Sequence, residues 1–240
     1  MNENTESSFN KLLIPGSVII AGLLIAGAVM WNNSHPATVG AGGQQGSENA
    51  DISKVKIDGE PYLGDPKAPV AIAFWSDFQC PYCKAFEVGH PQIPTPAAMP
   101  EIIKNYVDTG KVKIIFKDFA FLGPDSQTAS LYGRAVWDLY PEQYFAWRTA
   151  MYGAQDEENG GFGDEASVIA LTKTIAGIDA AKVTQATKDN KSAYEAAIAA
   201  DRDEAQSFGV SATPSFIVGK SVIPGAQPYS SFQKAIDALL

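Results

Sequence analysis

The two cysteines of this chain stand three positions apart, directly after a strongly apolar stretch. That stretch is Val70-Ala-Ile-Ala-Phe-Trp75, and its lack of polar alternation predicts a strand buried on both faces. Cys80-Pro81-Tyr82-Cys83 follows it. Pro81 suits the first position of a helix, because its ring fixes φ and its missing N–H would be unpaired there anyway. The sequence therefore predicts a strand, a turn and a helix, with Cys80 capping the helix and Cys83 one turn inside it.

This placement indicates thiol–disulfide chemistry. Two thiols can form a disulfide only if their Cα atoms lie within about 7 Å, and positions three apart on a first helical turn meet that condition. The helix N-terminus favours a thiolate at Cys80, so we expect Cys80 to form the mixed disulfide. Cys83 should be less accessible and should resolve that intermediate. Apart from this redox-active disulfide, no cofactor is expected.

Tyr82 should tune the redox potential of the pair. A histidine at this position could add positive charge beside Cys80, whereas tyrosine is neutral. We therefore expect a moderately oxidising couple, in the glutaredoxin range of about −200 to −230 mV, and not one near −120 mV.

Other uses of the two cysteines are disfavoured. Closing so short a loop removes little chain entropy, so a purely structural disulfide would contribute little. A zinc site needs four ligands, and the remaining candidates are only His35 and His90, so no metal is expected. The net charge of −9 and the absence of any run of basic residues argue against nucleic-acid binding.

The N-terminal region predicts a membrane tether. After a short tail (residues 1–11), residues 12–31 carry no charge, and a helix of that length spans the roughly 30 Å of one hydrocarbon core. Lys11 precedes the span and the next basic residue is Lys54, which predicts the remainder of the chain outside the cytoplasm. A cleaved signal peptide is the alternative, with Val39-Gly40-Ala41 as a late candidate site. We expect an uncleaved signal anchor, followed by a flexible linker at 32–50 rich in Gly, Ser, Asn and Gln.

Residues 51–240 predict a single α/β domain. A second strand is expected at Lys111–Asp118, and a hairpin with a Gly219-Lys220 turn is expected near the C-terminus, before a closing helix. Between them, residues 122–208 have an almost entirely helical pattern, with Asp164 and Asp179 as helix caps. This order predicts an α/β sheet fold with an inserted helical subdomain.

Three segments together resemble the DsbA-like thiol–disulfide oxidoreductases, in particular their membrane-anchored bacterial branch. They are Tyr62-Leu-Gly-Asp-Pro-Lys-Ala-Pro69, Phe74-Trp-Ser-Asp-Phe-Gln-Cys-Pro-Tyr-Cys83 and Gly209-Val-Ser-Ala-Thr-Pro-Ser-Phe-Ile-Val-Gly219. The resemblance extends over about residues 61–240 and implies a thioredoxin-like fold with an inserted helical domain.

The resemblance also assigns roles. It implies that Cys80 is the nucleophile, that Cys83 is the resolving cysteine, and that Thr213-Pro214 forms a cis-proline loop that pairs its backbone with substrate. Pro81, Tyr82 and Thr213 are the expected substrate contacts, and Pro214 is counted with the two cysteines as catalytic.

Two positions near the cysteines leave open questions. Many members of the family carry an acidic residue six positions before the nucleophile, where this chain has Phe74. Asp77 could substitute for it, or could simply cap the turn after the strand. Lys84 is expected to be a solvated surface lysine.

These observations predict a disulfide-forming oxidase on the extracytoplasmic side of a cell membrane, anchored by a single span. Its expected partners are cysteine-containing secreted proteins and a membrane redox partner, either a quinone-linked oxidase or an electron donor. A disulfide reductase or isomerase uses the same chemistry and remains an alternative, although no dimerisation segment is visible and a monomer is expected. A redox-inert peptide-binding or chaperone module is the third possibility.

Overall fold

The computed structural model describes residues 50–240. The predicted tail, membrane span and most of the linker lie outside the described residues and stay predictions. Among residues 50–240, no helix is both long and apolar enough to cross a bilayer.

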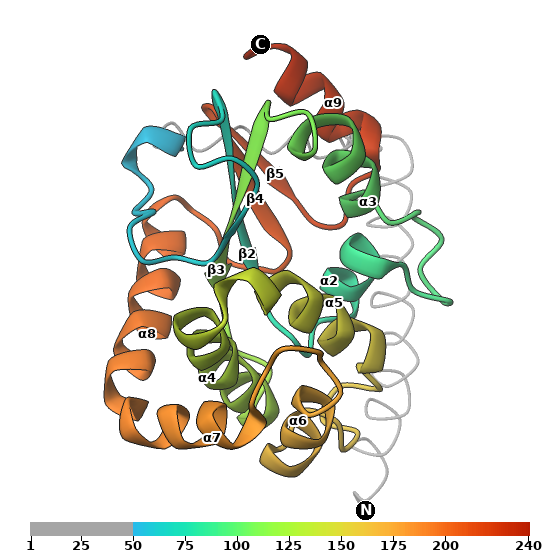
Figure 1. The fold of residues 1–240 in the computed structure, drawn as a ribbon. Coiled ribbons are helices and arrows are strands. Elements are labelled where there is room, and N and C mark those ends of the chain that lie inside the picture. The colour runs from blue at the N-terminus through green and yellow to red at the C-terminus, as the bar shows by residue number, and fades with distance from the viewer. Residues whose placement is uncertain (1–49) are drawn as a thin grey trace, which may run out of the picture. The chain divides into compact units, whose positions relative to one another are not determined.

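The described part of the chain is a five-stranded mixed sheet with helices on both faces (Figure 1). The strands lie in the order β1-β3-β2-β4-β5, and only β2 and β3 run parallel to each other. Their bounds are β1 Tyr62–Leu63, β2 Val70–Ser76, β3 Val112–Asp118, β4 Ser215–Val218 and β5 Ser221–Pro224. The predicted strands are all present, and the two-residue β1 is an edge strand that the sequence pattern did not reveal.

The helices divide into those that flank the sheet and those that form a block of their own (Figure 1). The flanking elements are η1 Ile52–Lys54, α2 Pro81–Val88, α3 Met99–Ile102, η2 Ile103–Val107 and α9 Tyr229–Asp237. The block between β3 and β4 contains α4 Pro124–Leu139, η3 Pro141–Gln143, α5 Tyr144–Ala154, α6 Glu165–Thr172, α7 Ala180–Asp189 and α8 Lys191–Ser207. These helices account for the helical pattern expected at 122–208.

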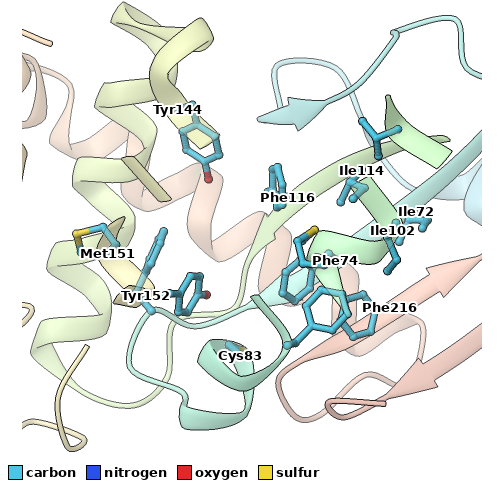
Figure 2. Packing of buried hydrophobic residues seen from close by; sticks show 14 of the residues in the cluster. Ile72, Phe74, Cys83, Ile102, Ile114, Phe116, Tyr144, Met151, Tyr152 and Phe216 are labelled. Carbon is cyan, nitrogen blue, oxygen red and sulfur yellow. The ribbon is translucent and has the colours of Figure 1, made fainter. Parts of the chain in front are cut away.

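Aromatic side chains fill the core on the face of the sheet that α2 covers. Phe74 on β2 stacks on Phe216 of β4, with ring centroids 4.5 Å apart, and meets Phe86 of α2 edge-on at 5.1 Å. Cys83 belongs to the same buried cluster, together with Tyr152 of α5 (Figure 2). The opposite face of β2 carries the fully buried Trp75, whose indole nitrogen donates to the carbonyl of Asp201 in α8.

Turn and cap residues set where these elements begin and end. Asp164 and Asp179 accept hydrogen bonds from backbone N–H groups at the starts of α6 and α7, as predicted. The hairpin turns at Gly219-Lys220, and Gly219 has a φ of +60°, which suits glycine. The antiparallel pairing of β2 with β4 places Trp75, near the end of β2, opposite Ser215, the first residue of β4.

Candidate active site

Cys80 is the N-cap residue of α2 and Pro81 occupies the first helical position, as the sequence predicted. The backbone of Cys80 is extended (φ −76°, ψ 119°), and its carbonyl accepts from the N–H groups of Cys83 and Lys84, both at 3.1 Å. Cys80 is 5% exposed and Cys83 is fully buried, so Cys83 is the less accessible of the two. Both are free thiols in this structure.

Several hydrogen-bond donors converge on the Cys80 sulfur. The Cys83 thiol, the Thr213 hydroxyl and the backbone N–H groups of Cys83 and Tyr82 stabilise a thiolate here, against the opposing effect of burial, and lower the pKa of Cys80 to about 7. In the protonated state the Cys80 thiol donates to the Thr213 carbonyl at 3.4 Å. Cys80 is therefore poised to ionise near neutral pH.

Cys83 has the opposite environment. Complete burial raises the pKa of its thiol well above the ordinary value, and its hydrogen bond to Cys80 and the negative charge of Asp77 raise it further. The two thiols thus have widely separated acidities. This separation fits an attacking Cys80 and a resolving Cys83 that remains protonated until its turn in the reaction.

The Thr213–Pro214 peptide bond is cis, as the resemblance implied. The pairing of β4 with β2 brings this loop against the Cys80 turn. The Thr213 hydroxyl is buried and has no other hydrogen-bond partner among the described residues, which leaves it available to the Cys80 sulfur. Of the other expected substrate contacts, Tyr82 is 54% exposed and Pro81 is half-buried.

Asp77 acts as a buried cap in this structure. Its carboxylate accepts from the N–H groups of Gln79, Phe121 and Leu122 at 2.8–3.1 Å, and from the Ser126 hydroxyl at 2.6 Å. Four donors fill the acceptor positions of the two oxygens, so this carboxylate has no free position for a proton from Cys83. Burial nevertheless raises the pKa of Asp77. Ser126, which donates to Asp77, lies in the first turn of α4, and this helix begins at Pro124 after Gly123.

A buried ion pair lies under the active-site helix and was not predicted. The Arg148 guanidinium on α5 donates to Glu87 of α2 at 2.7 Å and to the Ser76 hydroxyl at 2.8 Å, and it lies 4.3 Å from the ring centroid of Phe116. Glu87 is four residues after Cys83, hence on the same buried side of the helix. This spacing was the sequence signal for the ion pair, because a carboxyl one turn after a buried thiol is itself buried and needs a buried cation as its partner.

Glutamine side chains around the cysteine turn were also missed. Gln79 donates to the Phe162 carbonyl and accepts from the Asn159 N–H, while the Gln155 amide donates to the carbonyls of Phe78 and Cys80. Lys84 is not a free surface lysine as expected, because its ammonium donates to the Gln155 carbonyl at 2.5 Å. No sequence signal pointed to these contacts, whose partners lie more than 70 positions apart.

A pair of thiols of different acidity, at the start of a helix that follows a central strand and beside a cis-proline, defines the thioredoxin-fold thiol–disulfide oxidoreductases. The comparisons with known proteins agree. The family profile described as Thioredoxin matches residues 56–238, so the chain belongs to that family, and within it to the DsbA-like proteins.

Curated relatives include the disulfide bond formation protein D of Bacillus subtilis, 26% identical over 196 residues that cover 81% of this chain and 82% of that protein. The probable disulfide bond formation protein D of Bacillus anthracis is 27% identical, covering 96% of this chain and 97% of the relative. Among solved structures, oxidised BdbD from Bacillus subtilis has a TM-score of 0.66 at 26% identity, covering 77% of this chain and 94% of its own. The thiol-disulfide exchange protein alpha-DsbA2 from Wolbachia pipientis has a TM-score of 0.63 at 29% identity, covering 75% and 87%. The chain is therefore a thiol–disulfide oxidoreductase.

Proposed function

We propose that this protein introduces disulfide bonds into cysteine-containing secreted proteins, with Cys80 as the reactive sulfur. The observation that carries the proposal is the geometry of the thiol pair: Cys80 caps α2 beside the cis Thr213–Pro214 bond, and the fully buried Cys83 lies one turn inside the helix. The names of the relatives, which are disulfide bond formation proteins, support the same direction.

The reaction begins with the Cys80–Cys83 disulfide. A substrate thiolate attacks the Cys80 sulfur, the Cys80–Cys83 bond breaks, and Cys83 leaves and takes up a proton, as its raised pKa favours. A second substrate thiolate then attacks the substrate sulfur of the mixed disulfide. Cys80 departs as a thiolate, which its low pKa makes a good leaving group. The substrate loses two electrons and gains a disulfide, and the enzyme is left as a dithiol.

The site around Cys80 would hold the substrate chain during this exchange. Thr213 and cis-Pro214 provide backbone next to the reactive sulfur, and the exposed Tyr82 ring, with Pro81, offers an apolar surface on the open side. These assignments rest on the family resemblance and on the position of each residue beside Cys80.

A membrane partner would complete the cycle by reoxidising the dithiol. The uncharged segment at residues 12–31 and the position of Lys11 support an anchored protein whose catalytic domain faces outside the cytoplasm, where thiol oxidation is sustained. The protein should then be found in the membrane fraction. A protease that cannot cross the intact cell membrane should digest residues 50–240 when it is added from outside. Recovery of the protein in the cytosolic fraction would contradict this location.

One observation keeps a reductase or isomerase as the second candidate. A thiol pKa of about 7 matches the value typical of thioredoxin, about 7, and lies well above the roughly 3.5 of a strongly oxidising site. The neutral Tyr82 also favours a less oxidising site, because it adds no positive charge beside Cys80.

Trapping the redox state of the protein in cells separates the two directions of electron flow. Cells are quenched with acid, treated with a thiol-alkylating reagent that adds mass, and the protein is resolved by size. An oxidase should be found mostly as the Cys80–Cys83 disulfide, whereas a mostly dithiol population would establish a reductase or isomerase. Full activity of a Cys80→Ala variant in complementation would instead support a redox-inert binding module.

A further inference from the structure

One buried glutamine, Gln155 of the helical block, is hydrogen-bonded to the turn that carries Cys80. Gln155, directly after α5, donates its side-chain amide to the Phe78 carbonyl at 2.6 Å and to the Cys80 carbonyl at 3.2 Å. Both acceptors can only accept, so the amide must face them with its NH2 group. Gln155 is 4% exposed, so water does not compete for these two hydrogen bonds.

Two further side chains join the same segments. The Lys84 ammonium donates to the Gln155 backbone carbonyl at 2.5 Å, which links the first turn of α2 to the end of α5. On the other side, Gln79 bonds to the backbone of Asn159 and Phe162. The connection between α5 and α6 is thus attached to residues before and after Cys80.

The side-chain oxygen of Gln155 is buried and has no hydrogen-bond partner within residues 50–240. Leaving a buried acceptor unpaired costs free energy. The hydrogen bonds that the Gln155 side chain does make are its two bonds to carbonyls of the turn that carries Cys80.

We propose that Gln155 is a positioning residue for the reactive sulfur, by which the helical block holds Cys80 at the N-terminus of α2. The inference rests on the proposed role of Cys80 as the attacking thiol. The thiolate is stabilised by backbone N–H groups of Tyr82 and Cys83, and these stabilise it only if the Cys80 sulfur stays over the helix N-terminus. Gln155 touches no reacting atom. It restrains the backbone on either side of the sulfur, since it holds the carbonyls of Phe78 and Cys80 together.

The test compares variants at Gln155 by the pH profile of alkylation of the reduced full-length protein, with the modified cysteine identified by mass spectrometry. Gln155→Met keeps the volume and removes both donors. Gln155→Glu places a carboxylate oxygen against two carbonyls. In each variant the midpoint for Cys80 should rise by about half a pH unit or more, and the alkylation rate at pH 6.5 should fall about threefold.

A matched control is Gln185→Met on the exposed side of α7, where the amide donates only to Asp189, and it should leave the midpoint unchanged. Gln155→Asn keeps the amide but shortens its reach, so it should fold even if the methionine variant does not, and it should give a smaller shift in the same direction. Thermal unfolding monitored by circular dichroism accompanies each variant.

A lowered melting temperature with an unchanged Cys80 midpoint, in whichever Gln155 variants fold, would overturn the proposal and leave Gln155 a structural residue. Alkylation by a small reagent needs no protein substrate. A shifted midpoint in an enzyme that exchanges no disulfide with substrates would therefore count against the proposed function and not against the positioning role.

Discussion

The acidity of Cys80 depends on groups that belong to different parts of the chain. Its own helix supplies the backbone N–H groups and the Cys83 thiol, whereas the Thr213 hydroxyl comes from a loop more than 130 positions away. The separation in acidity of the two cysteines is therefore a property of the folded protein and not of the Cys-Pro-Tyr-Cys motif alone.

Replacing Thr213 by valine should make Cys80 less acidic. The substitution keeps the shape of the side chain but removes the one side-chain hydroxyl that stabilises the thiolate. The midpoint of Cys80 alkylation should lie near pH 7 in the natural protein and about half a unit higher in Thr213→Val. A midpoint near 8.5 in the natural protein would show that the donors around the sulfur do not act as described.

Replacing Tyr82 by histidine should make the disulfide more oxidising. Tyr82 is 54% exposed, so an imidazole there would carry part of a positive charge near neutral pH and stabilise the Cys80 thiolate. We expect the potential to rise by about 30 mV, which corresponds to about 1.4 kcal/mol, when equilibrium with a glutathione buffer is measured. Tyr62→His on the edge strand is the control, because Tyr62 is similarly exposed at 39%. Equal potentials in all three proteins would refute an electrostatic role for position 82.

Among the elements, α2 and α5 are joined by the buried pair of Glu87 and Arg148. Burial raises the pKa of Glu87, although the charge of Arg148 opposes that rise. A guanidinium cannot give up its proton at accessible pH, whereas a carboxyl can take one up. Arg148 should therefore stay charged when Glu87 is removed, whereas Glu87 can become neutral when Arg148 is removed.

Glu87→Gln should lower the free energy of unfolding by about 3–5 kcal/mol, because it leaves Arg148 charged, buried and without a counter-ion. The double variant Glu87→Gln/Arg148→Met should lose less than Glu87→Gln alone. Denaturant unfolding measures both. Glu195→Gln, which removes an exposed partner of Lys191 on α8, should change stability by less than about 1 kcal/mol. A similar small loss for Glu87→Gln would mean that the buried pair is not formed.

Sequence patterns predicted those elements whose signals lie within a few residues of one another. The cap at Cys80, the caps at Asp164 and Asp179 and the Gly219-Lys220 hairpin are of this kind. The contacts of Gln155 and Arg148 with the active-site helix were not predicted, because 61 to 77 positions separate the partners. Local sequence patterns do not predict contacts between residues so far apart. In addition, a polar residue that follows an apolar helix is normally interpreted as exposed.

At the scale of the whole domain, an ionic cluster fastens the helical block to the sheet. It consists of Glu60, Lys117, Asp118, Arg134, Asp201 and Glu204. Lys117 on β3 contacts Asp201 of α8 at 2.5 Å, and Arg134 of α4 contacts Glu60 at 2.7 Å. Four carboxyl groups face two cations, so the fully ionised cluster carries excess negative charge. Burial and the charge of Asp201 raise the pKa of Glu60 to about 7.

This cluster should make stability depend on pH. The folded protein holds a proton on Glu60 that the unfolded chain, with a pKa near 4.5, has already released, so the stabilising contribution is full below pH 4.5 and is lost as pH rises through 7. Relative to Glu60→Gln, the natural protein should lose about 1–3 kcal/mol of unfolding free energy between pH 5 and pH 8. Glu158→Gln, in an exposed loop, is the control. A difference between natural protein and Glu60→Gln that does not change with pH would show that Glu60 is ionised throughout.

The central claim is that Cys80, and not Cys83, is the sulfur that forms the mixed disulfide with substrate. The most direct test uses Cys83→Ala with Cys80 activated as a mixed disulfide with glutathione. It is incubated with a reduced secreted protein that retains a single cysteine, and the cross-linked peptides are mapped by mass spectrometry. We predict a stable, reductant-sensitive conjugate through Cys80, and none from the matched Cys80→Ala variant treated in the same way. Conjugation through Cys83 in the Cys80→Ala variant, with no conjugate through Cys80, would contradict the assignment of the two thiols.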